Sequence, residues 1–255
     1  MKLDHLIEKI QQLSGNYYAE DRLQILQKKI ENFLRKNNLS IDEIFLNEER
    51  TSLFIDNVLV NETSFFRHYQ QLEEFRELYL KPLVDKGEFR ILSAGCSTGK
   101  EVYTLAMMAM ETGSLPERKL FEGMDLSRFA LSVARKGVYS KKTLNQIPQE
   151  YRKYISTDGE YLYISEKIKK LTEFTWGNIL DLKAFPENHY DVIFCRNVFI
   201  YFNPEYINYV LYNFRKALKK DGVLVVSPVE FLSPENHKLF RPEKIKQYTF
   251  YRRVG

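Results

Sequence analysis

The chain has few of the residues that mark several large classes of protein. Its 255 residues include only two cysteines, Cys96 and Cys195, and neither has a second cysteine or a histidine at metal-ligand spacing. A disulfide scaffold and a zinc site are therefore not indicated, and we expect two reduced thiols and no bound metal.

Long apolar runs and runs of like charge are also missing. No eighteen consecutive residues are apolar, and the N-terminal segment alternates charged and apolar residues at helical spacing, unlike a signal peptide. We therefore expect a cytoplasmic protein without membrane insertion. The net charge is +4, but lysine and arginine are scattered and no five like charges adjoin, so nucleic acid is not an expected partner.

The pattern of the residues that are present changes near residue 60. Residues 1–60 carry helical periodicity and no strand signal, and Leu23, Leu26, Ile30, Phe33 and Leu34 fall on one face of a predicted helix. This predicts a small helical domain. On the other side of that helix Arg22, Lys29 and Lys36 recur every seven residues, which indicates either a solvated face or a docking surface for an acidic partner.

From residue 61 onward helices and strands alternate. A helix is predicted from Thr63 or Ser64 to Tyr79, and a strand from Phe89. Further helices are expected at 101–113, 127–136 and 204–219, and further strands at 119–125, 172–176, 190–195, 222–227 and 245–254. This alternation predicts a parallel sheet flanked by helices, with 150–171 as a small β insertion.

Polar residues follow two of the predicted strands. The buried strand 192–194 ends in Cys195, Arg196 and Asn197, and polar groups at such a strand end usually face a ligand crevice. The strand from Phe89 ends in a turn bounded by Gly95 and Gly99, where backbone can approach a ligand closely. That turn lacks the third glycine of the dinucleotide fingerprint and is too short for a phosphate loop.

Two acidic residues indicate which nucleotide-like ligand would suit this crevice. Asp125 ends the next strand and could accept both hydroxyls of a ribose, or it could be a helix N-cap. Glu101 could favour a helix dipole or hold a ligand's ammonium group. Acidic groups without a phosphate cradle favour an adenosine with an amino-acid tail, S-adenosylmethionine.

Five sequence blocks extend this interpretation. They are VNETSFFR (60–67), SAGCSTGKE (93–101), GMDLS (123–127), GNILD (177–181) and CRNVFIYF (195–202). In their residues and order they resemble the chemotaxis receptor glutamate methyltransferases, the CheR family, over almost the whole chain. The resemblance implies an α/β fold: a Rossmann-like methyltransferase domain over 61–255 with an antiparallel C-terminal strand, a helical domain over 1–60, and a small β-subdomain at about 150–171.

The resemblance also implies the site residues. S-adenosylmethionine would be surrounded by Asn61, Thr63, Arg67, Glu101, Asp125, Asn178, Ile179, Arg196 and Asn197, in addition to Gly95 of the turn. Arg67 and Tyr201 would lie nearest the transferred methyl group and act in catalysis. Without the resemblance, Thr63 reads as a helix cap, Asn178 as a turn former and Tyr201 as a core aromatic.

The implied reaction forms methyl esters on glutamate side chains of chemoreceptors, with S-adenosylhomocysteine as the second product. A glutamate with a pKa of about 4.3 is already ionised at neutral pH and needs no general base. The partner would be the cytoplasmic helical region of a chemoreceptor or a similar acidic helical protein, with Arg22, Lys29 and Lys36 as a docking face.

The chain departs from the family in two loops. Lys100, Glu101 and Val102 stand where two acidic residues and a proline are usual, and 227–231 reads SPVEF where the family commonly shows Gly-His-Ser-Glu. At 100–102 only the second of the two usual acidic residues is retained, as Glu101. The difference at 227–231 leaves the choice of substrate open. Because the β insertion is compact, we expect no dependence on a receptor-tail peptide.

Two other functions are compatible with parts of the sequence. A nucleic-acid methyltransferase is suggested by Asn203-Pro204-Glu205-Tyr206, but Asn203 and Pro204 are better placed as the cap and first residue of a helix. A regulatory module that binds S-adenosylmethionine without catalysis, or a methyltransferase for a different acceptor, is suggested by the altered loops.

Overall fold

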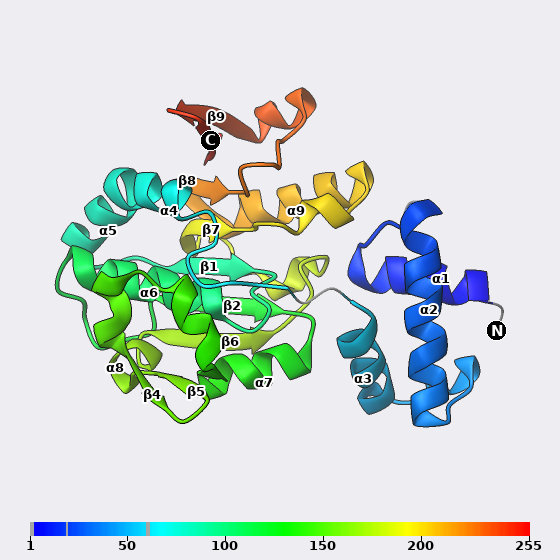
Figure 1. Ribbon diagram of the computed structural model, residues 1–255. Coiled ribbons are helices and arrows are strands. Elements are labelled where there is room, and N and C mark those ends of the chain that lie inside the picture. Colours follow the sequence, from blue (N-terminus) through cyan, green and yellow to red (C-terminus); the bar gives the residue numbers. More distant parts are fainter. Residues whose placement is uncertain (1–2, 19, 60–61) are drawn as a thin grey trace.

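The computed structural model describes residues 3–18, 20–59 and 62–255. A group of helices between residues 3 and 58 lies beside a larger α/β part that contains the central sheet (Figure 1). Asn61, one of the predicted ligand-binding residues, lies outside the described residues.

The N-terminal helices are α1 (Leu3–Ser14), α2 (Glu20–Asn37) and α3 (Glu48–Val58). They share a hydrophobic core that is separate from those of the sheet and contains Leu6, Leu26, Ile30, Phe33 and Phe54. The predicted apolar face of α2 is thus confirmed, because Leu26, Ile30 and Phe33 are all buried. Burial of one apolar stripe per helix stabilises such a group.

The central sheet has seven strands in the order β6-β2-β1-β7-β8-β10-β9. The strands are β1 (Ile91–Ala94), β2 (Phe121–Asp125), β6 (Thr172–Trp176), β7 (Tyr190–Phe194), β8 (Leu218–Val225), β9 (Phe240–Ile245) and β10 (Tyr248–Arg253). The first five in spatial order run parallel, and β10 is antiparallel to both neighbours. The predicted fold class and the antiparallel final strand are therefore confirmed.

Helices cover both faces of this sheet. Val192 and Phe194 of β7 belong to the same core as residues of α6 (Lys100–Thr112), whereas Ile193 belongs to the core of α9 (Pro204–Ala217). Because side chains alternate along a strand, α6 and α9 pack on opposite faces. Besides short 3-10 helices, the other described helices are α4 (Tyr69–Phe75), the π-helical η2 (Arg76–Leu80), α5 (Lys81–Lys86), α7 (Arg128–Lys136) and the short α8 (Glu166–Lys169).

The predicted helix from Thr63 to Tyr79 is wrong in its first part. Residues 65–68 form a turn in which Phe66 and His68 have φ of 51° and 56°, and α4 begins only at Tyr69. The turn buries Phe65 and Phe66 together at 2% and 5% exposure, which adjacent positions of a surface helix do not favour. Leu78, which lies within the predicted helix, is 43% exposed.

The β insertion is larger than predicted. Its hairpin, β4 (Ile155–Asp158) and β5 (Tyr161–Ile164), is joined by β3 (Val138–Ser140) in the order β3-β5-β4. The small sheet therefore begins before residue 150, the predicted start of the insertion. The sequence did not predict β3, because a strand of three residues is too short to show periodicity. β9 was also not predicted, because Pro242 interrupts its pattern; proline is tolerated there since β9 is an edge strand.

The N-terminal helices contact the carboxyl end of the sheet. The Ser127 hydroxyl, just after β2, donates to Asp56 of α3 at 2.6 Å. The Asn178 side-chain amide, after β6, donates to the carbonyl of Leu13 at 2.7 Å. The helices thus close one side of the region where the predicted site residues lie.

Candidate functional site

A cavity of about 1150 Å³, including the part open to solvent, lies at the carboxyl ends of the parallel strands. All ten predicted site residues in the described part of the chain line it: Thr63, Arg67, Gly95, Glu101, Asp125, Asn178, Ile179, Arg196, Asn197 and Tyr201. Crevices at this edge of a parallel sheet are the usual ligand sites of such folds. The five sequence blocks therefore meet at one place.

Asp125 is the last residue of β2 and is 9% exposed. Its two carboxylate oxygens accept hydrogen bonds from the backbone N–H groups of Ser97, at 2.6 Å, and Ser127, at 2.8 Å. Burial raises the pKa of Asp125, and these N–H groups oppose that rise. The N-cap of α7 is Ser127, so the alternative role of Asp125 as that cap is wrong.

The turn between β1 and α6 requires glycine for packing. Gly95 and Gly99 both have φ of 78°, a left-handed conformation that other residues adopt at a cost. A Cβ atom at Gly95 would lie 2.8 Å from Val198, and one at Gly99 would lie 2.7 Å from both Ala134 and Phe174. Side chains of the same protein therefore pack closely against this backbone, so a ligand is not the sole reason for its glycines.

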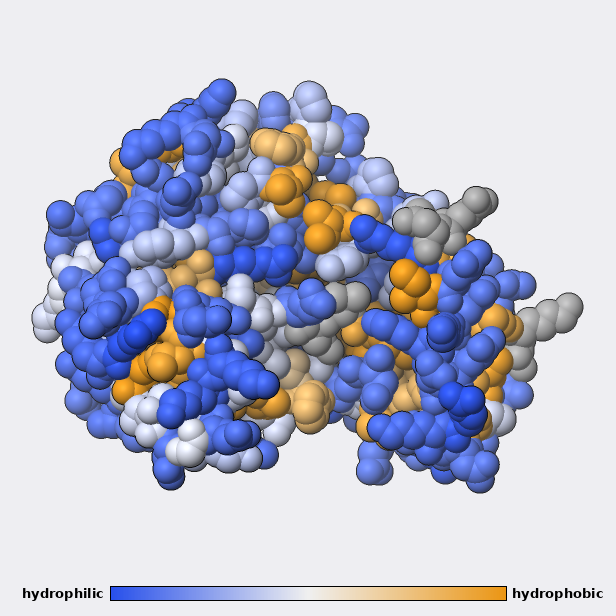
Figure 2. Space-filling view, viewed as in Figure 1, coloured by the Kyte–Doolittle hydropathy of each residue, from blue (hydrophilic) through white to orange (hydrophobic). Residues whose placement is uncertain are grey.

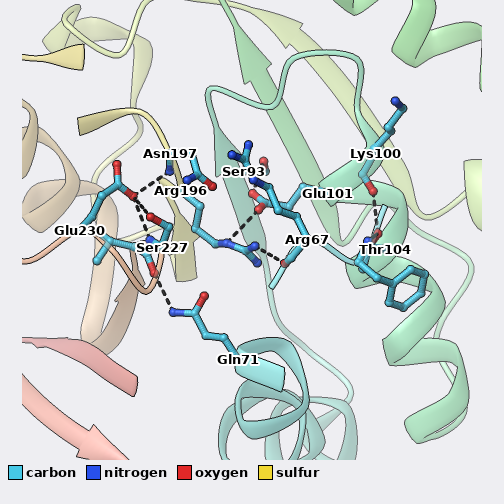
Figure 3. Close-up of polar contacts among 12 residues, drawn as sticks. Arg67, Gln71, Ser93, Lys100, Glu101, Thr104, Arg196, Asn197, Ser227 and Glu230 are labelled. Atoms are coloured by element: carbon cyan, nitrogen blue, oxygen red, sulfur yellow. Dashed lines mark hydrogen bonds and ion pairs between the residues drawn. The ribbon is translucent and has the colours of Figure 1, made fainter. Parts of the chain in front are cut away.

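The buried Arg196 and the partly buried Glu101 form an ion pair in the cavity lining (Figure 3). The Arg196 Nε lies 3.5 Å from Glu101 Oε2, and its Nη2 donates to the backbone carbonyl of Arg67. Glu101 also accepts a 2.8 Å hydrogen bond from the Ser93 hydroxyl. The Arg196 side chain is 1% exposed, and burial lowers its pKa while Glu101 opposes the shift.

One buried polar atom beside this ion pair, the Nη1 donor of Arg196, has no hydrogen-bond partner among the described residues. The buried Oδ1 of Asn197 lies beside the His68 ring, whose Nε2 also lacks a hydrogen bond of good geometry. Buried polar groups are nearly always paired, so the free Nη1 donor of a cavity-lining residue suits a bound polar ligand.

Glu230 holds the strand end that carries these residues (Figure 3). It is 6% exposed and accepts hydrogen bonds from the N–H of Asn197 at 2.7 Å, of Ser227 at 2.9 Å and of Ile200 at 3.2 Å. The Ser227 hydroxyl adds a fourth donor at 2.6 Å. The sequence prediction missed Glu230; its signal was an acidic residue between apolar neighbours just after a strand.

Arg67 and Tyr201 both line the cavity. The guanidinium of Arg67 has only a long 3.5 Å contact to the carbonyl of Glu62, and no carboxylate lies within ion-pair distance of it in the described part of the chain. The Tyr201 ring lies 5.7 Å from the guanidinium of Arg22 on α2. The carbonyl of Thr63, which is not a helix cap, accepts from Lys100 Nζ at 3.2 Å.

Other lining residues carried no signal in the sequence. Ser14, Asn16 and Leu59 come from the N-terminal helices and the segments after them, and they complete the wall opposite the sheet. Asn178 does form a turn, because its Oδ1 accepts from the N–H of Leu180 at 3.0 Å, but its side chain also joins this wall through Leu13. Only the packing of the helices on the sheet brings these groups together.

The three basic residues predicted on α2 have different surroundings. Arg22 is exposed and lies over Tyr201, Lys29 Nζ donates to the carbonyl of Val58 at 3.2 Å, and Lys36 is exposed. Lys29 is therefore partly engaged within the chain. Arg22 and Lys36 remain accessible.

The residues that the structure describes contain no group of three or more His, Cys, Asp or Glu side chains that could hold a metal ion. Within the same residues, no helix is both long and apolar enough to span a membrane.

Comparison with known proteins matches residues 61–249 to the family described as CheR methyltransferase, SAM binding domain. A chemotaxis protein methyltransferase of Borreliella burgdorferi is 33% identical over 210 residues, covering 78% of this chain and 71% of that protein. A probable biofilm formation methyltransferase of Pseudomonas putida is 30% identical, covering 75% of this chain and 47% of that protein.

A chemotaxis protein methyltransferase of Campylobacter jejuni is similar over nearly the full length of both chains. It is 28% identical over 255 residues, covering 96% of this chain and 95% of that protein. The family match covers all of the sheet except most of β10, and it includes every strand end that lines the cavity. The chain belongs to the CheR methyltransferase family, whose matched part is described as binding S-adenosylmethionine.

Proposed function

We propose that this protein transfers methyl groups from S-adenosylmethionine to glutamate side chains of chemoreceptors in chemotaxis adaptation. The single observation that carries the proposal is the convergence of ten family-type residues on one cavity at the carboxyl ends of β1, β2 and β7. The similar proteins from B. burgdorferi and C. jejuni, both chemotaxis protein methyltransferases, support the same reaction. In this proposal the protein acts in the cytoplasm, and residues 1–60 and 61–255 are separate domains.

The cavity residues fit S-adenosylmethionine, which supplies an activated methyl group when bound. The nearly buried carboxylate of Asp125 suits ribose hydroxyls. The unpartnered Arg196 Nη1 suits a carboxylate, while Asn197 Oδ1 and Glu101 suit an ammonium group. Asp125, Glu101, Arg196 and Asn197 would therefore hold the ligand, with Thr63, Gly95, Asn178 and Ile179 around it.

The remaining task of the protein is to place the acceptor carboxylate. Arg67 can orient it by a charge-assisted hydrogen bond, since no carboxylate of the described chain competes for its guanidinium. The acceptor is ionised at neutral pH, so orientation and exclusion of water are the effects to be supplied, together worth several kcal/mol. Tyr201 would pack or hydrogen-bond beside the transferred methyl group.

The proposed partner is the acidic helical region of a chemoreceptor. Arg22 and Lys36 are the accessible cations of the predicted docking face, and Arg22 adjoins the cavity through Tyr201. Charge reversal at Lys36, which lies on the same helix but touches no cavity residue among those described, would test docking apart from catalysis. At low salt, where charges are least screened, the variant is expected to bind the receptor more weakly than wild type does.

The experiment that tests the function is transfer of labelled methyl groups to receptor cytoplasmic fragments, followed by mild base. Methyl esters hydrolyse under these conditions, whereas N-methyl groups do not. Base-labile label on the receptor would support the proposal. Base-stable label would indicate a different acceptor group, and binding of S-adenosylhomocysteine without any transfer would favour a regulatory binding module.

A further inference from the structure

Three apolar side chains are exposed beside the cavity mouth. Ile200, which precedes Tyr201 of the cavity wall, is 41% exposed; Val229 is 64% and Phe231 is 73% exposed. We call these three residues the apolar rim. In Figure 2 apolar surface gathers near the segment that follows β8.

The backbone that carries the rim is held firmly by a buried group. Glu230 lies between Val229 and Phe231 and accepts from the N–H of Ile200 at 3.2 Å. Its own N–H donates to the carbonyl of Ser227 at 3.0 Å and closes a tight turn. One buried carboxylate thus fixes both loops, and the rim is preorganised, which lowers the entropic cost of binding a partner.

The rim and Arg67 flank the same opening. Arg67 and Tyr201, the residue after Ile200, both line the cavity, and Asn197 of that wall is hydrogen-bonded to Glu230. Figure 3 draws Arg67 and Glu230, the residue between Val229 and Phe231, around the same Arg196 side chain, so a segment that delivers a carboxylate to Arg67 comes close to the rim. An exposed apolar group set beside a cation without an internal counter-charge suits a partner that presents acidic and apolar side chains close together.

We propose that the apolar rim binds the acceptor protein itself, through apolar side chains about one helical turn from the glutamate that is methylated. This inference rests on the proposed function and names a surface that selects its substrate. Val229 and Phe231 are the two most exposed members of this surface. Residues three or four apart on a helix lie on one face, which lets one acceptor helix reach both Arg67 and the rim.

The test compares wild type with a Val229→Ser/Phe231→Ser variant and with a Phe129→Ser control. Phe129 on α7 is 64% exposed and is not a cavity residue, so it matches the loss of exposed apolar surface elsewhere. Three quantities are measured: KM and kcat for receptor fragments, the Kd of those fragments in the presence of S-adenosylhomocysteine, and the Kd of S-adenosylhomocysteine by calorimetry.

The rim variant is expected to raise the receptor KM and Kd by about tenfold, as loss of an interface anchor does. Its kcat and its Kd for S-adenosylhomocysteine should stay within about twofold of wild type, and the control should match wild type. Unchanged receptor KM and Kd would overturn the proposal. The proposal would also be overturned if wild type and the Phe129→Ser control were dimers and the rim variant were a monomer. The rim would then bind a second copy of the chain.

Failure of the proposed function has a different signature. Wild type that binds S-adenosylhomocysteine but methylates no receptor would refute that function, whereas the rim concerns receptor affinity alone. If wild type also fails to bind the fragments, both proposals fall. If it binds them and the rim variant binds equally well, the rim proposal alone fails.

Discussion

The carboxylate of Glu230 accepts a 2.7 Å hydrogen bond from the backbone N–H of Asn197, a residue with φ of 60° at the end of β7. A left-handed backbone at a residue other than glycine is costly and persists where its surroundings hold it. Glu230 supplies that hold and links the strand end to the turn after β8.

Replacing Glu230 with alanine is expected to lower the free energy of unfolding by about 3 kcal/mol, because buried N–H groups lose a charged acceptor. S-adenosylhomocysteine should also bind more weakly, since Asn197 and Arg196 lose their support. Urea denaturation and calorimetry measure the two effects. Glu230→Gln should lower the stability less than Glu230→Ala does. Glu235→Ala, at an exposed site in the same segment, should leave the stability almost unchanged. Wild-type stability of Glu230→Ala would show that Asn197 is held by other contacts.

Asp125→Asn is expected to weaken binding of S-adenosylhomocysteine by about tenfold or more, the effect of losing a charged hydrogen-bond acceptor. Calorimetry at neutral pH measures it. Asp56→Asn is a matched control, because Asp56 accepts from Ser127 at 2.6 Å but does not line the cavity. Equal losses in both variants would mean that the loop's conformation, and not the Asp125 charge, governs affinity.

The affinity for S-adenosylhomocysteine should fall as the pH is lowered toward the pKa of Asp125, which burial raises above 3.8. A protonated carboxyl group is a poorer acceptor for ribose hydroxyls. The free energy of unfolding should change in the opposite direction. Ionised Asp125 destabilises the fold above its raised pKa, and this destabilisation is lost as the pH falls toward 3.8, so the fold becomes more stable. Calorimetry and urea denaturation across acidic pH, with Asp125→Asn as the reference, separate the two. The same pH dependence in Asp125→Asn would exclude Asp125 as its source.

Arg67→Ala is expected to lower kcat for receptor methylation by at least about tenfold, because the acceptor carboxylate loses its orienting cation. The Kd of S-adenosylhomocysteine should change less, since the Arg67 atom that Arg196 contacts is a backbone carbonyl, which alanine retains. Steady-state kinetics and calorimetry on the same preparation measure both. Arg67→Lys should recover part of the rate. Full activity of Arg67→Ala would remove its assigned role.

Both cysteines should resist thiol reagents in the folded protein. Cys96 and Cys195 are buried free thiols, and burial raises the pKa of each, so little reactive thiolate forms at neutral pH. Titration with a chromogenic disulfide reagent is expected to detect two thiols in urea and almost none without it. Rapid reaction of one thiol in native buffer would reveal local opening at the β1 or β7 strand end.

Much of the fold followed from short-range patterns. The alternation of helices and strands predicted the parallel sheet, and α2 was located from the spacing of Leu26, Ile30 and Phe33. The polar residues after β1, β2 and β7 were identified as one site because parallel strands bring their carboxyl ends to one edge. These predictions depend on periodicity and topology, which a linear sequence records.

Other features depend on contacts between distant residues. The turn at Phe66 and His68 forms because Phe66 N–H donates to the Thr104 hydroxyl at 3.1 Å, and Thr104 lies on α6. β3 exists only because β5 pairs with it, and Pro242 is tolerated only because β9 is an edge. Local propensity cannot report such partners.

The sequence by itself determined the type and order of the main elements and the chemical identity of most of the site, since both depend on residue type and spacing. Tertiary structure alone decided that Glu230 supports Asn197, that Leu13 meets Asn178, and that Val229 and Phe231 are exposed beside the cavity. The physical reason is that hydrogen bonding and burial are settled by which surfaces meet after the chain has folded, and residues far apart in sequence supply those surfaces.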